Sequence, residues 1–493
     1  MIPSLREKCG VFGVYAPGED VARLTFFGLH SLQHRGQESA GIATTDGDSI
    51  SMYGDMGLVS QIFDETGLEG LHGIAAIGHT RYSTTGSSTA ANTQPLIVTD
   101  TADHRPLLDG QQRQLALAHN GNIVNADLLR ADLESQGVVF ESTTDSEVIA
   151  QLVATAPGAT WEERFAVMMR RANGAYSLTV LTRDALFGVR DPNGVRPLCI
   201  GRVDGGYVLA SETCALDHLG ATFVREVEPG EVVRIDASGI TSWQPVEPMR
   251  RALCLFEYIY FARPDSRMRG ELLYEARMRM GAKLSREHPV AADVVIGVPD
   301  SATAAAIGYA QAAGIPYVEA IVKNRYVGRT FIQPDHRLRE RGVQLKYNPL
   351  PEMLRGKRVV VVDDSIVRGT TTPRIVTMLR ESGALEVHMR ITSPQIQHPC
   401  FYGVDMATKG ELIGAHLSIE EVREHIGADS LGHLSLEGTA AATGQSEGAL
   451  CTACFSGQYP RPVPLEFDKL SLETRPADRD PVPEPVTPLP LVR

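Results

Sequence analysis

The sequence lacks the features that mark membrane, nucleic-acid-binding and disulfide-rich proteins. None of its apolar runs approaches the roughly 20 residues that a helix needs to cross a bilayer. The opening MIPSLREK has no apolar segment of the kind found in secretory signals. Lys and Arg number 47 against 60 Asp and Glu, for a net charge of −13, so no broad basic excess is available for nucleic-acid phosphates. We therefore expect a cytoplasmic protein with neither a nucleic-acid nor a membrane partner.

Cysteine is also scarce, with seven residues, an odd number at wide spacings. A secreted disulfide framework normally shows an even number at close spacings, so a reducing compartment is favoured. The thiols are then available for catalysis or for metal binding. Cys199 and Cys214 match no motif and are expected in the core.

The chain is long enough, at 493 residues, for two domains. Up to Trp243, short apolar runs such as GVFGVY and AYSLTVL are broken by Gly, Asn, Asp and Pro, which predicts many strands. Helices are expected over 20–33, 126–136 and 145–154. This combination of many short strands and a few helices indicates an α+β domain.

The sequence pattern changes after residue 250. Helical segments (272–287, 301–313 and 372–381) alternate with the runs DVVIGVPD, KRVVVVDD and VHMRITSP. Strands that are apolar on both faces, alternating with helices, predict an α/β domain with a mainly parallel sheet. The domain boundary is expected near 244–254, and the Pro-rich residues 456–493 are expected to form a mobile tail.

Cys9 begins the apolar run CGVFGVY, and a cysteine in such a strand is more often a buried core residue. The motifs that follow it favour another interpretation, because they place many polar groups beside apolar strands. They are LQHRGQESAG, GHTRYSTTG, LAHNGNIVN and TTDSEVI. Together, and in this order, they resemble the glutaminase domain of the N-terminal-nucleophile amidotransferases, an αββα sandwich, over most of residues 9–240.

This resemblance implies a catalytic role for Cys9. Removal of residues 1–8 as a propeptide would free its α-amine, whose reference pKa of about 8 suits it to accept the thiol proton. A thiol becomes a strong nucleophile only after it loses that proton. Asn120 and Gly121 would form the oxyanion hole, where donors stabilise the charge that develops on the glutamine carbonyl.

The same resemblance implies that Arg81 and Asp145 hold the substrate glutamine. Arg81 would bind its α-carboxylate through two parallel hydrogen bonds, and Asp145 would bind its α-ammonium. A structural salt bridge is the alternative for Arg81. For Asp145 the alternative is an N-cap of the helix that begins SEVIAQLV, a role compatible with substrate binding.

The run VVVVDDSIVRGTT (359–371) predicts a buried strand, a glycine-containing loop and a helix. Ligands bind at the carboxyl ends of parallel strands, where loop N–H groups hold anions. A plain polar turn is the alternative, but Asp363 and Asp364 would then be costly without partners. The run closely resembles the signature of type I phosphoribosyltransferases, which bind 5-phosphoribosyl 1-diphosphate (PRPP). Expected PRPP contacts are Asp363, Asp364, Ser365, Arg368, Gly369, Thr370 and Thr371.

Two further segments fit a PRPP site. Ser301, in VIGVPDSATAAA, and the two adjacent aspartates would bind Mg²⁺, which prefers oxygen ligands. The segment KNRYVGRTFIQP resembles a flap that closes over PRPP, with Lys323 and Arg325 contacting the diphosphate. The alternative is that these cations are simply solvated.

The two domains in one chain resemble the amidophosphoribosyltransferase family. The implied reaction converts glutamine, PRPP and water to 5-phosphoribosylamine, glutamate and diphosphate, the first committed step of purine synthesis, with ammonia passing between the sites inside the protein. The family also implies a homotetramer inhibited by purine nucleotides. Hexosamine-phosphate and glutamate synthases share only the glutaminase half. A regulatory protein that merely senses PRPP would have no need of Cys9.

Four cysteines lie outside both predicted sites. Cys451 and Cys454 form a CTAC pair, which alone could be a redox motif, half a zinc site or neither. Cys254 opens CLFEYIYFARPDS and Cys400 closes QIQHPC. Four thiolates suit either an iron–sulfur cluster or zinc. The resemblance is to the family branch that carries a propeptide and a structural [4Fe–4S] cluster held at these motifs.

Overall fold

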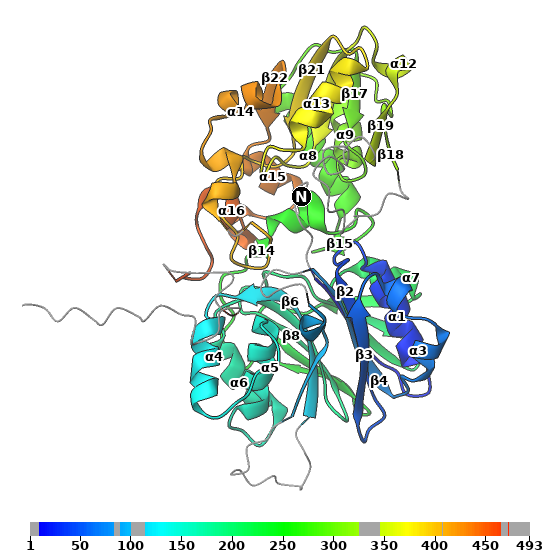
Figure 1. Cartoon of the computed structure of the whole chain (residues 1–493), viewed down its shortest axis with the longest axis vertical. Coiled ribbons are helices and arrows are strands. Elements are labelled where there is room, and N and C mark those ends of the chain that lie inside the picture. The colour runs from blue at the N-terminus through cyan, green and yellow to red at the C-terminus, as the bar shows by residue number, and fades with distance from the viewer. Residues whose placement is uncertain are drawn as a thin grey trace, which may run out of the picture.

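The computed structural model describes residues 9–82, 89–99, 114–324, 346–406, 408–464 and 472. Two lobes lie end to end along the long axis (Figure 1), with the strand-rich lobe of residues 9–243 below and the α/β lobe above. None of the helices in these ranges has both the length and the apolarity to cross a membrane.

The lower lobe contains two antiparallel sheets packed face to face. The seven-stranded sheet has the order β11(Thr222–Glu226), β9(Cys199–Val203), β10(Gly206–Ala210), β1(Gly10–Tyr15), β4(Ala75–Arg81), β2(Ser39–Thr45) and β3(Ile50–Met56). The six-stranded sheet has the order β13(Gly239–Trp243), β12(Val232–Asp236), β8(Leu186–Arg190), β7(Gly174–Leu181), β6(Gln114–Ile123) and β5(Leu96–Thr99).

Helices cover the outer faces of both sheets (Figure 1). One side has α1(Val21–Ser31), α2(Val59–Ile62), α3(Glu65–Glu69) and α7(Thr213–His218), and the other has α4(Ala126–Ser135), α5(Asp145–Thr155) and α6(Trp161–Arg171). A short turn, η1(Ala90–Asn92), precedes β5. The predicted αββα sandwich is therefore confirmed, and the three expected helices occur within a few residues of their predicted bounds.

Strand β1 shows why the apolar runs of this lobe are nearly continuous. Its side chains alternate between two cores, with Phe12 and Val14 packed under α1 and Val11 and Tyr15 packed between the sheets. Helix α1 lies so close that a Cβ on Gly28 would meet the Phe12 ring at 2.5 Å. Both faces of the strand are thus buried, and neither tolerates polar residues.

The upper lobe is built on the parallel sheet β17(Val294–Gly297)–β20(Arg358–Asp363)–β21(Glu386–Ile391)–β22(Ser430–His433). The four valines of β20 alternate between two cores: Val360 and Val362 face one, Val359 and Val361 the other. The first core contains side chains of α8(Leu273–Glu287), α9(Thr303–Ala313) and α15(Leu436–Ala442), and the second those of α13(Thr372–Glu381) and α14(Ile419–Ile426). The predicted parallel sheet covered by helices is confirmed.

Short elements complete this lobe. Three strand pairs are β14(Leu253–Cys254) with β23(Leu450–Cys451), β15(Arg267–Met268) with β16(Glu271–Leu272), and β18(Ile321–Lys323) with β19(Tyr347–Pro349). The remaining helical segments are η2(Glu257–Phe261), a π-helical turn, with α12(Pro351–Leu354), η3(Lys409–Glu411), η4(Ile413–Ala415), η5(Glu447–Ala449) and α16(Ala453–Ser456).

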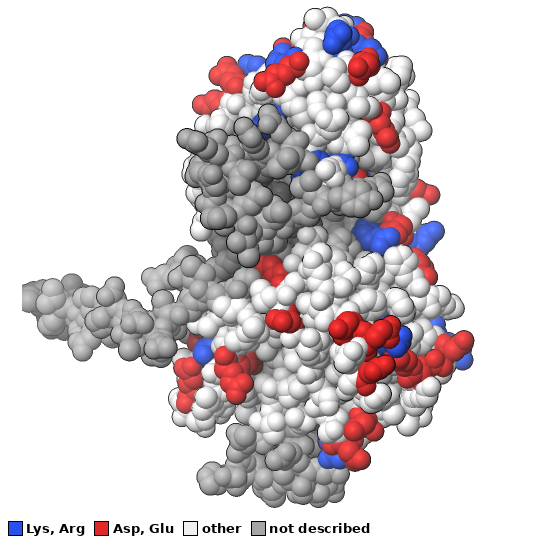
Figure 2. Space-filling model, turned by 45° about the vertical axis from the view of Figure 1, so that its right-hand side comes forward, with Lys and Arg blue, Asp and Glu red and all other residues white. Residues whose placement is uncertain are grey.

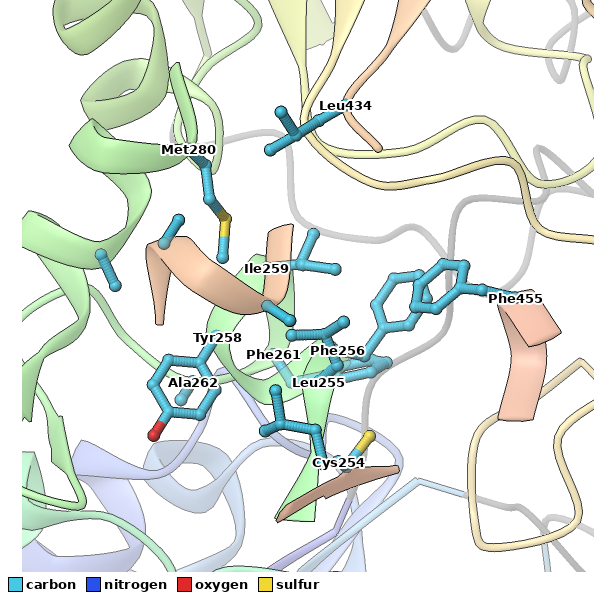
Figure 3. Close-up of a cluster of buried hydrophobic side chains, with 14 of the residues drawn as sticks. Cys254, Leu255, Phe256, Tyr258, Ile259, Phe261, Ala262, Met280, Leu434 and Phe455 are labelled. Carbon is cyan, nitrogen blue, oxygen red and sulfur yellow. The ribbon is translucent and has the colours of Figure 1, made fainter. Parts of the chain in front are cut away.

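The two lobes share a hydrophobic core at their junction. Figure 3 shows the centre of this core, where Phe256 and Phe455 stack with ring centroids 5.4 Å apart. Val124, Ala175 and Val195 of the lower lobe belong to the same buried cluster. On the face in Figure 2, acidic side chains predominate over the lower lobe, as the negative net charge predicts.

Candidate active sites and a group of four cysteines

A pocket at the upper end of the sandwich brings together four of the residues predicted to act on glutamine. They are Cys9, Arg81, Gly121 and Asp145. Five residues that the sequence did not single out complete its lining: Tyr82, Gln94, His119, Thr144 and Ser146. These residues lie within β6, at or next to the ends of β1, β4 and β5, and at the start of α5, so the two sheets and this helix fix their positions.

Cys9 is buried, and its Sγ donates a hydrogen bond to the carbonyl oxygen of Tyr82 at 3.4 Å. Burial raises the pKa of the thiol to about 11, against the lowering effects of that hydrogen bond and of the Arg81 charge. The thiol is therefore protonated at neutral pH, and catalysis requires a base that removes its proton.

Asn120 lies on β6 with only 1% of its surface exposed. Within the described part of the chain, its Nδ2 has no hydrogen-bond partner. A buried donor without an acceptor costs free energy unless a ligand supplies the acceptor. Next to it, Gly121 has φ +153, and a Cβ there would lie 2.0 Å from the carbonyl oxygen of Ala175, so only glycine fits. An unsatisfied amide beside a glycine is an arrangement suited to an oxyanion hole.

Asp145 is the first residue of α5, but it is not the N-cap. The cap is Thr144, whose side chain accepts a hydrogen bond from the backbone N–H of Glu147 at 3.3 Å. The carboxylate of Asp145 instead accepts from the backbone N–H of Ile123 at 3.0 Å and lies 3.7 Å from His119 Nδ1. The capping alternative for Asp145 is therefore wrong. Arg81 ends β4 and is almost fully buried.

A buried charged network beneath this pocket was missed by the sequence interpretation. Arg35 donates from Nε to the carbonyl oxygen of Cys9 at 3.1 Å and from Nη2 to Glu257 of the upper lobe at 3.0 Å. It also contacts Glu212, and Arg196 lies 3.5 Å from Glu257. The motifs containing Arg35 and Glu257 were recognised, but no local pattern in the sequence pairs residues so far apart.

The second candidate site lies at the carboxyl end of β20. Asp364 is buried, and its carboxylate accepts from the hydroxyls of Ser301 and Ser365, each at 2.6 Å. Asp363 accepts from the backbone N–H of Asp364 at 2.9 Å. Burial raises the pKa of both carboxyl groups, and for Asp363 repulsion by Asp364 adds to the effect. Adjacent acidic oxygens held in this way fit a divalent cation, whose charge would relieve the repulsion.

The loop after β20 closes against η4. Gly369 has φ +65, and a Cβ there would lie 2.4 Å from Ile413 Cδ1. Thr371 Oγ1 is buried without a hydrogen-bond partner in the described residues, whereas Thr370 is exposed. Arg368 does not stand free for phosphate, because its Nε donates to Glu411 at 2.9 Å.

The cations expected to bind diphosphate are only partly described. Lys323 Nζ lies 2.6 Å from Asp300, the residue before Ser301, so its side chain reaches the edge of this site. Arg325 lies outside the described residues, as does nearly all of the expected flap. The sequence interpretation did not identify Lys346, whose positive charge offsets part of the rise in the pKa of Asp363 that burial and Asp364 cause.

The four cysteines Cys254, Cys400, Cys451 and Cys454 converge on one region of the upper lobe. Cys254 and Cys451 occupy paired positions in β14 and β23. The pKa of each thiol is raised, first by burial and then by neighbouring thiols of this set or, for Cys254, by Glu257. None forms a disulfide. Among the described residues, no three His, Cys, Asp or Glu side chains are grouped closely enough to hold a single metal ion.

Comparisons with known proteins agree with the division into two lobes. A family model described as "Glutamine amidotransferase domain" matches residues 92–218, and one described as "Phosphoribosyl transferase domain" matches residues 269–392. A curated Synechococcus elongatus protein, amidophosphoribosyltransferase, is 52% identical over 476 residues, 95% of this chain and 94% of its own. The Bacillus subtilis protein of that name is 48% identical over 466 residues, covering 94% and 96%.

Solved structures give the same result. A structure described as the allosteric regulatory enzyme of purine biosynthesis is 46% identical with a TM-score of 0.88, covering 95% of this chain and 99% of its own. The B. subtilis glutamine PRPP amidotransferase, solved with ADP and GMP, is 47% identical with a TM-score of 0.87, covering 94% and 100%.

Proposed function

This chain belongs to the amidophosphoribosyltransferase family, and from that premise we propose how its residues divide the reaction between two sites. The family makes 5-phosphoribosylamine from glutamine, PRPP and water, releasing glutamate and diphosphate, in the step that commits PRPP to purine synthesis. We assign the release of ammonia to the pocket around Cys9 and its transfer to PRPP to the site around Asp363 and Asp364.

In the glutaminase half, Cys9 attacks the side-chain amide of glutamine. Its freed α-amine takes the thiol proton, and a carbon–sulfur bond forms while the carbonyl oxygen becomes an oxyanion. The Asn120 amide and the Gly121 N–H donate to this oxygen. The amine then returns a proton to the departing nitrogen, ammonia leaves, and water hydrolyses the thioester to glutamate. Arg81 and Asp145 hold the α-carboxylate and α-ammonium of the substrate.

In the transferase half, ammonia attacks C1 of the ribose and diphosphate leaves. Asp363 and Asp364 accept hydrogen bonds from the ribose hydroxyls. Ser365, Gly369, Thr370 and Thr371 line the 5-phosphate loop, while Lys323 and Arg325 contact the diphosphate. Arg368 can bind the phosphate only if its guanidinium first breaks its hydrogen bonds to Glu411. Bound Mg²⁺, held by Ser301, Asp363 and Asp364, would supply positive charge to the leaving diphosphate.

The observation that carries this proposal is the presence of both chemistries in one chain with a shared core. A buried thiol faces a pocket beside an amide that has no acceptor among the described residues. Val195 of the lower lobe and Phe256 of the upper lobe belong to one buried core. Ammonia released at Cys9 can then pass to PRPP inside the protein, where water does not compete for C1.

We further propose that the chain belongs to the branch with a propeptide and a [4Fe–4S] cluster. Cys254, Cys400, Cys451 and Cys454 would be the ligands, because these four thiols, two buried and two partly buried, lie in one region. A four-iron cluster binds each thiolate through a different iron, so its ligands stand farther apart than those of a single ion. The cluster would be structural, since the reaction has no redox step.

The remaining assignments complete the proposal. Residues 1–8 are the propeptide, 9–243 the glutaminase domain, 244–455 the transferase domain and 456–493 the tail. The first residues of that tail are not loose, because Tyr459 and Arg461 hydrogen-bond to Pro399 and Asn173. The assembly is a cytoplasmic homotetramer. We assign feedback inhibition by purine nucleotides to the PRPP phosphate loop and to a subunit interface. The B. subtilis relative solved with ADP and GMP supports the binding of such nucleotides.

Separate assays of the two half-reactions test this proposal. The variant Cys9→Ala should lose synthesis from glutamine but retain synthesis from PRPP and ammonium salts. The double variant Asp363→Asn/Asp364→Asn should lose synthesis from both nitrogen sources while retaining some hydrolysis of glutamine. Synthesis that survives the double substitution would refute the PRPP assignment, and glutaminase activity that survives Cys9→Ala would refute the nucleophile.

A further inference from the structure

One short segment of the upper lobe rests on the glutaminase pocket. Residues 401–406 follow Cys400 and lie against the end of β6, the strand that carries Asn120 and Gly121. The side chain of Asn122 donates from Nδ2 to the carbonyl oxygen of Phe401 at 2.9 Å. The buried guanidinium of Arg196 donates to the next carbonyl, that of Tyr402. Two successive carbonyls of this segment are therefore held by the lower lobe.

The third contact is between two backbones. Gly403 has φ +94, and a Cβ at this position would lie 2.8 Å from both the carbonyl carbon and the carbonyl oxygen of Gly121. It would also lie 3.1 Å from the Gly121 Cα. Gly403 therefore covers Gly121 directly, and any side chain there would have to displace it.

The segment is itself held firmly on its other side. Tyr402 donates its hydroxyl proton to the carbonyl oxygen of Arg461 at 2.7 Å, and Tyr459 donates to that of Pro399 at 2.7 Å. Arg461 also donates from Nε to Asn173 of the lower lobe at 2.9 Å. Through Arg461 this chain of hydrogen bonds reaches Asn173 of the lower lobe, so Gly403 cannot move away from Gly121 without breaking it.

We infer that residues 401–406 of the transferase domain position the oxyanion hole of the glutaminase site, with Gly403 as the positioning residue that fixes Gly121. The inference rests on the proposed role of Gly121 as an oxyanion donor. Such donors act only when they lie about 2.7–3.1 Å from the developing charge. Gly403 touches no substrate; it acts through Gly121. Because Cys400 adjoins this segment, the proposed cluster would stabilise the same backbone.

The test is Gly403→Ala in the full-length enzyme. Displacement of one oxyanion donor should lower the glutaminase kcat by about 10- to 100-fold, while the KM for glutamine changes less than about twofold. Synthesis from ammonium salts should be unchanged. The matched control is Gly18→Ala, because Gly18 has φ +95 with nothing within 4 Å of its Cβ position, so it isolates the backbone cost of alanine.

An aldehyde analogue of glutamine, glutamate γ-semialdehyde, gives a second readout. The Cys9 sulfur bonds to its carbonyl carbon while the C=O π bond opens, the α-amine of Cys9 takes the thiol proton, and the former carbonyl oxygen, now an alkoxide, occupies the oxyanion hole. Its affinity should fall in Gly403→Ala by the same factor as kcat, while the affinity for the product glutamate stays constant. A purely structural defect would weaken both ligands or neither.

A second variant keeps the inference testable if Gly403→Ala does not fold. Asn122→Ala removes the hydrogen bond to Phe401 without adding bulk, and it should lower kcat and aldehyde affinity in the same direction. Equal loss of both half-reactions, an effect on KM alone, or a result no larger than that of Gly18→Ala would overturn the inference. The proposed function is tested separately by Cys9→Ala. If that variant loses glutaminase activity, the proposed function holds even when the inference about Gly403 fails.

Discussion

Arg35 joins the backbone of Cys9 to Glu257 of the other lobe. Its Nε donates to the Cys9 carbonyl oxygen at 3.1 Å and its Nη2 to the Glu257 carboxylate at 3.0 Å. All three residues are buried. Burial alone would lower the pKa of Arg35, but the charges of Glu257 and Glu212 outweigh it and raise that pKa. The proposed nucleophile is thus held in place by a carboxylate of the transferase domain.

Neutralising Glu257 should therefore destabilise the protein strongly. Removing one partner of a buried ion pair typically costs about 3–5 kcal/mol, because the other charge stays buried. The expected result for Glu257→Gln is a clear fall in the thermal unfolding temperature, measured by calorimetry. Glu228→Gln is the control, since the ion pair of Glu228 with Arg251 is exposed and such pairs contribute about 1 kcal/mol or less. Similar shifts in the two variants would contradict the structural role of Glu257.

The pH dependence of glutamine hydrolysis should report the α-amine of Cys9 and not its thiol. Burial raises the pKa of the thiol to about 11, so it stays protonated across the neutral range. Below about pH 8 the amine is protonated as well and cannot accept the thiol proton. The kcat/KM for glutamine should therefore rise up to about pH 8 and then level off. A steady rise toward pH 11 would instead mean that the thiol ionises unaided.

Replacing Asp363 should stabilise the fold while removing activity. A carboxyl group whose pKa is raised on folding favours the folded state less as the pH climbs from its unfolded value of about 3.9 through its folded value. At pH 7 the charged group is therefore destabilising. We expect Asp363→Asn to raise the unfolding temperature by about 2–4 °C and to abolish synthesis from PRPP.

The control for that substitution has the opposite sign. Two hydrogen bonds from the side chain and one from the backbone of Arg358 hold the pKa of Asp293 down at about 2. This carboxylate stabilises the fold above its unfolded pKa, so Asp293→Asn should lower the unfolding temperature at pH 7. If Asp363→Asn also lowered the unfolding temperature, the charged carboxylate of Asp363 would not be destabilising.

Anaerobic purification should yield iron and acid-labile sulfide in a brown protein. Cys400→Ser should lose both, because the cluster would keep only three of its four thiolates. Cys199→Ser is the control, since the Cys199 thiol is buried elsewhere and donates to the carbonyl oxygen of Ala210 at 3.3 Å. Iron content and visible absorption decide the matter independently of activity. A colourless wild-type protein with stoichiometric zinc would refute the cluster.

Local patterns in the sequence predicted the parts of this molecule that depend on neighbouring residues. The valines of β20 are buried on both sides, as their run predicts, and the adjacent aspartates follow at the strand end. Asp145 begins its helix as expected, although Thr144 takes the capping role because its shorter side chain lies one residue earlier.

Contacts across long stretches of chain could not be predicted in the same way. Arg35 and Glu257 are 222 positions apart, and Arg368 meets Glu411 across 43. No periodicity or motif relates such residues, since their meeting depends on how whole lobes and loops pack. The contact of Gly403 with Gly121 belongs to the same class, because two glycines leave no side-chain pattern to read.

The shared core also bears on how such an enzyme can evolve. A chain divided between the lobes would leave Val124, Ala175 and Val195 without their covering partners and Arg35 without Glu257. If this glutaminase domain were fused to a different synthase domain, the new domain would have to supply both an apolar surface to cover these residues and a carboxylate to pair with Arg35. The shared core and the Arg35–Glu257 ion pair therefore constrain recombination at the domain boundary. We expect the two domains to be inherited together.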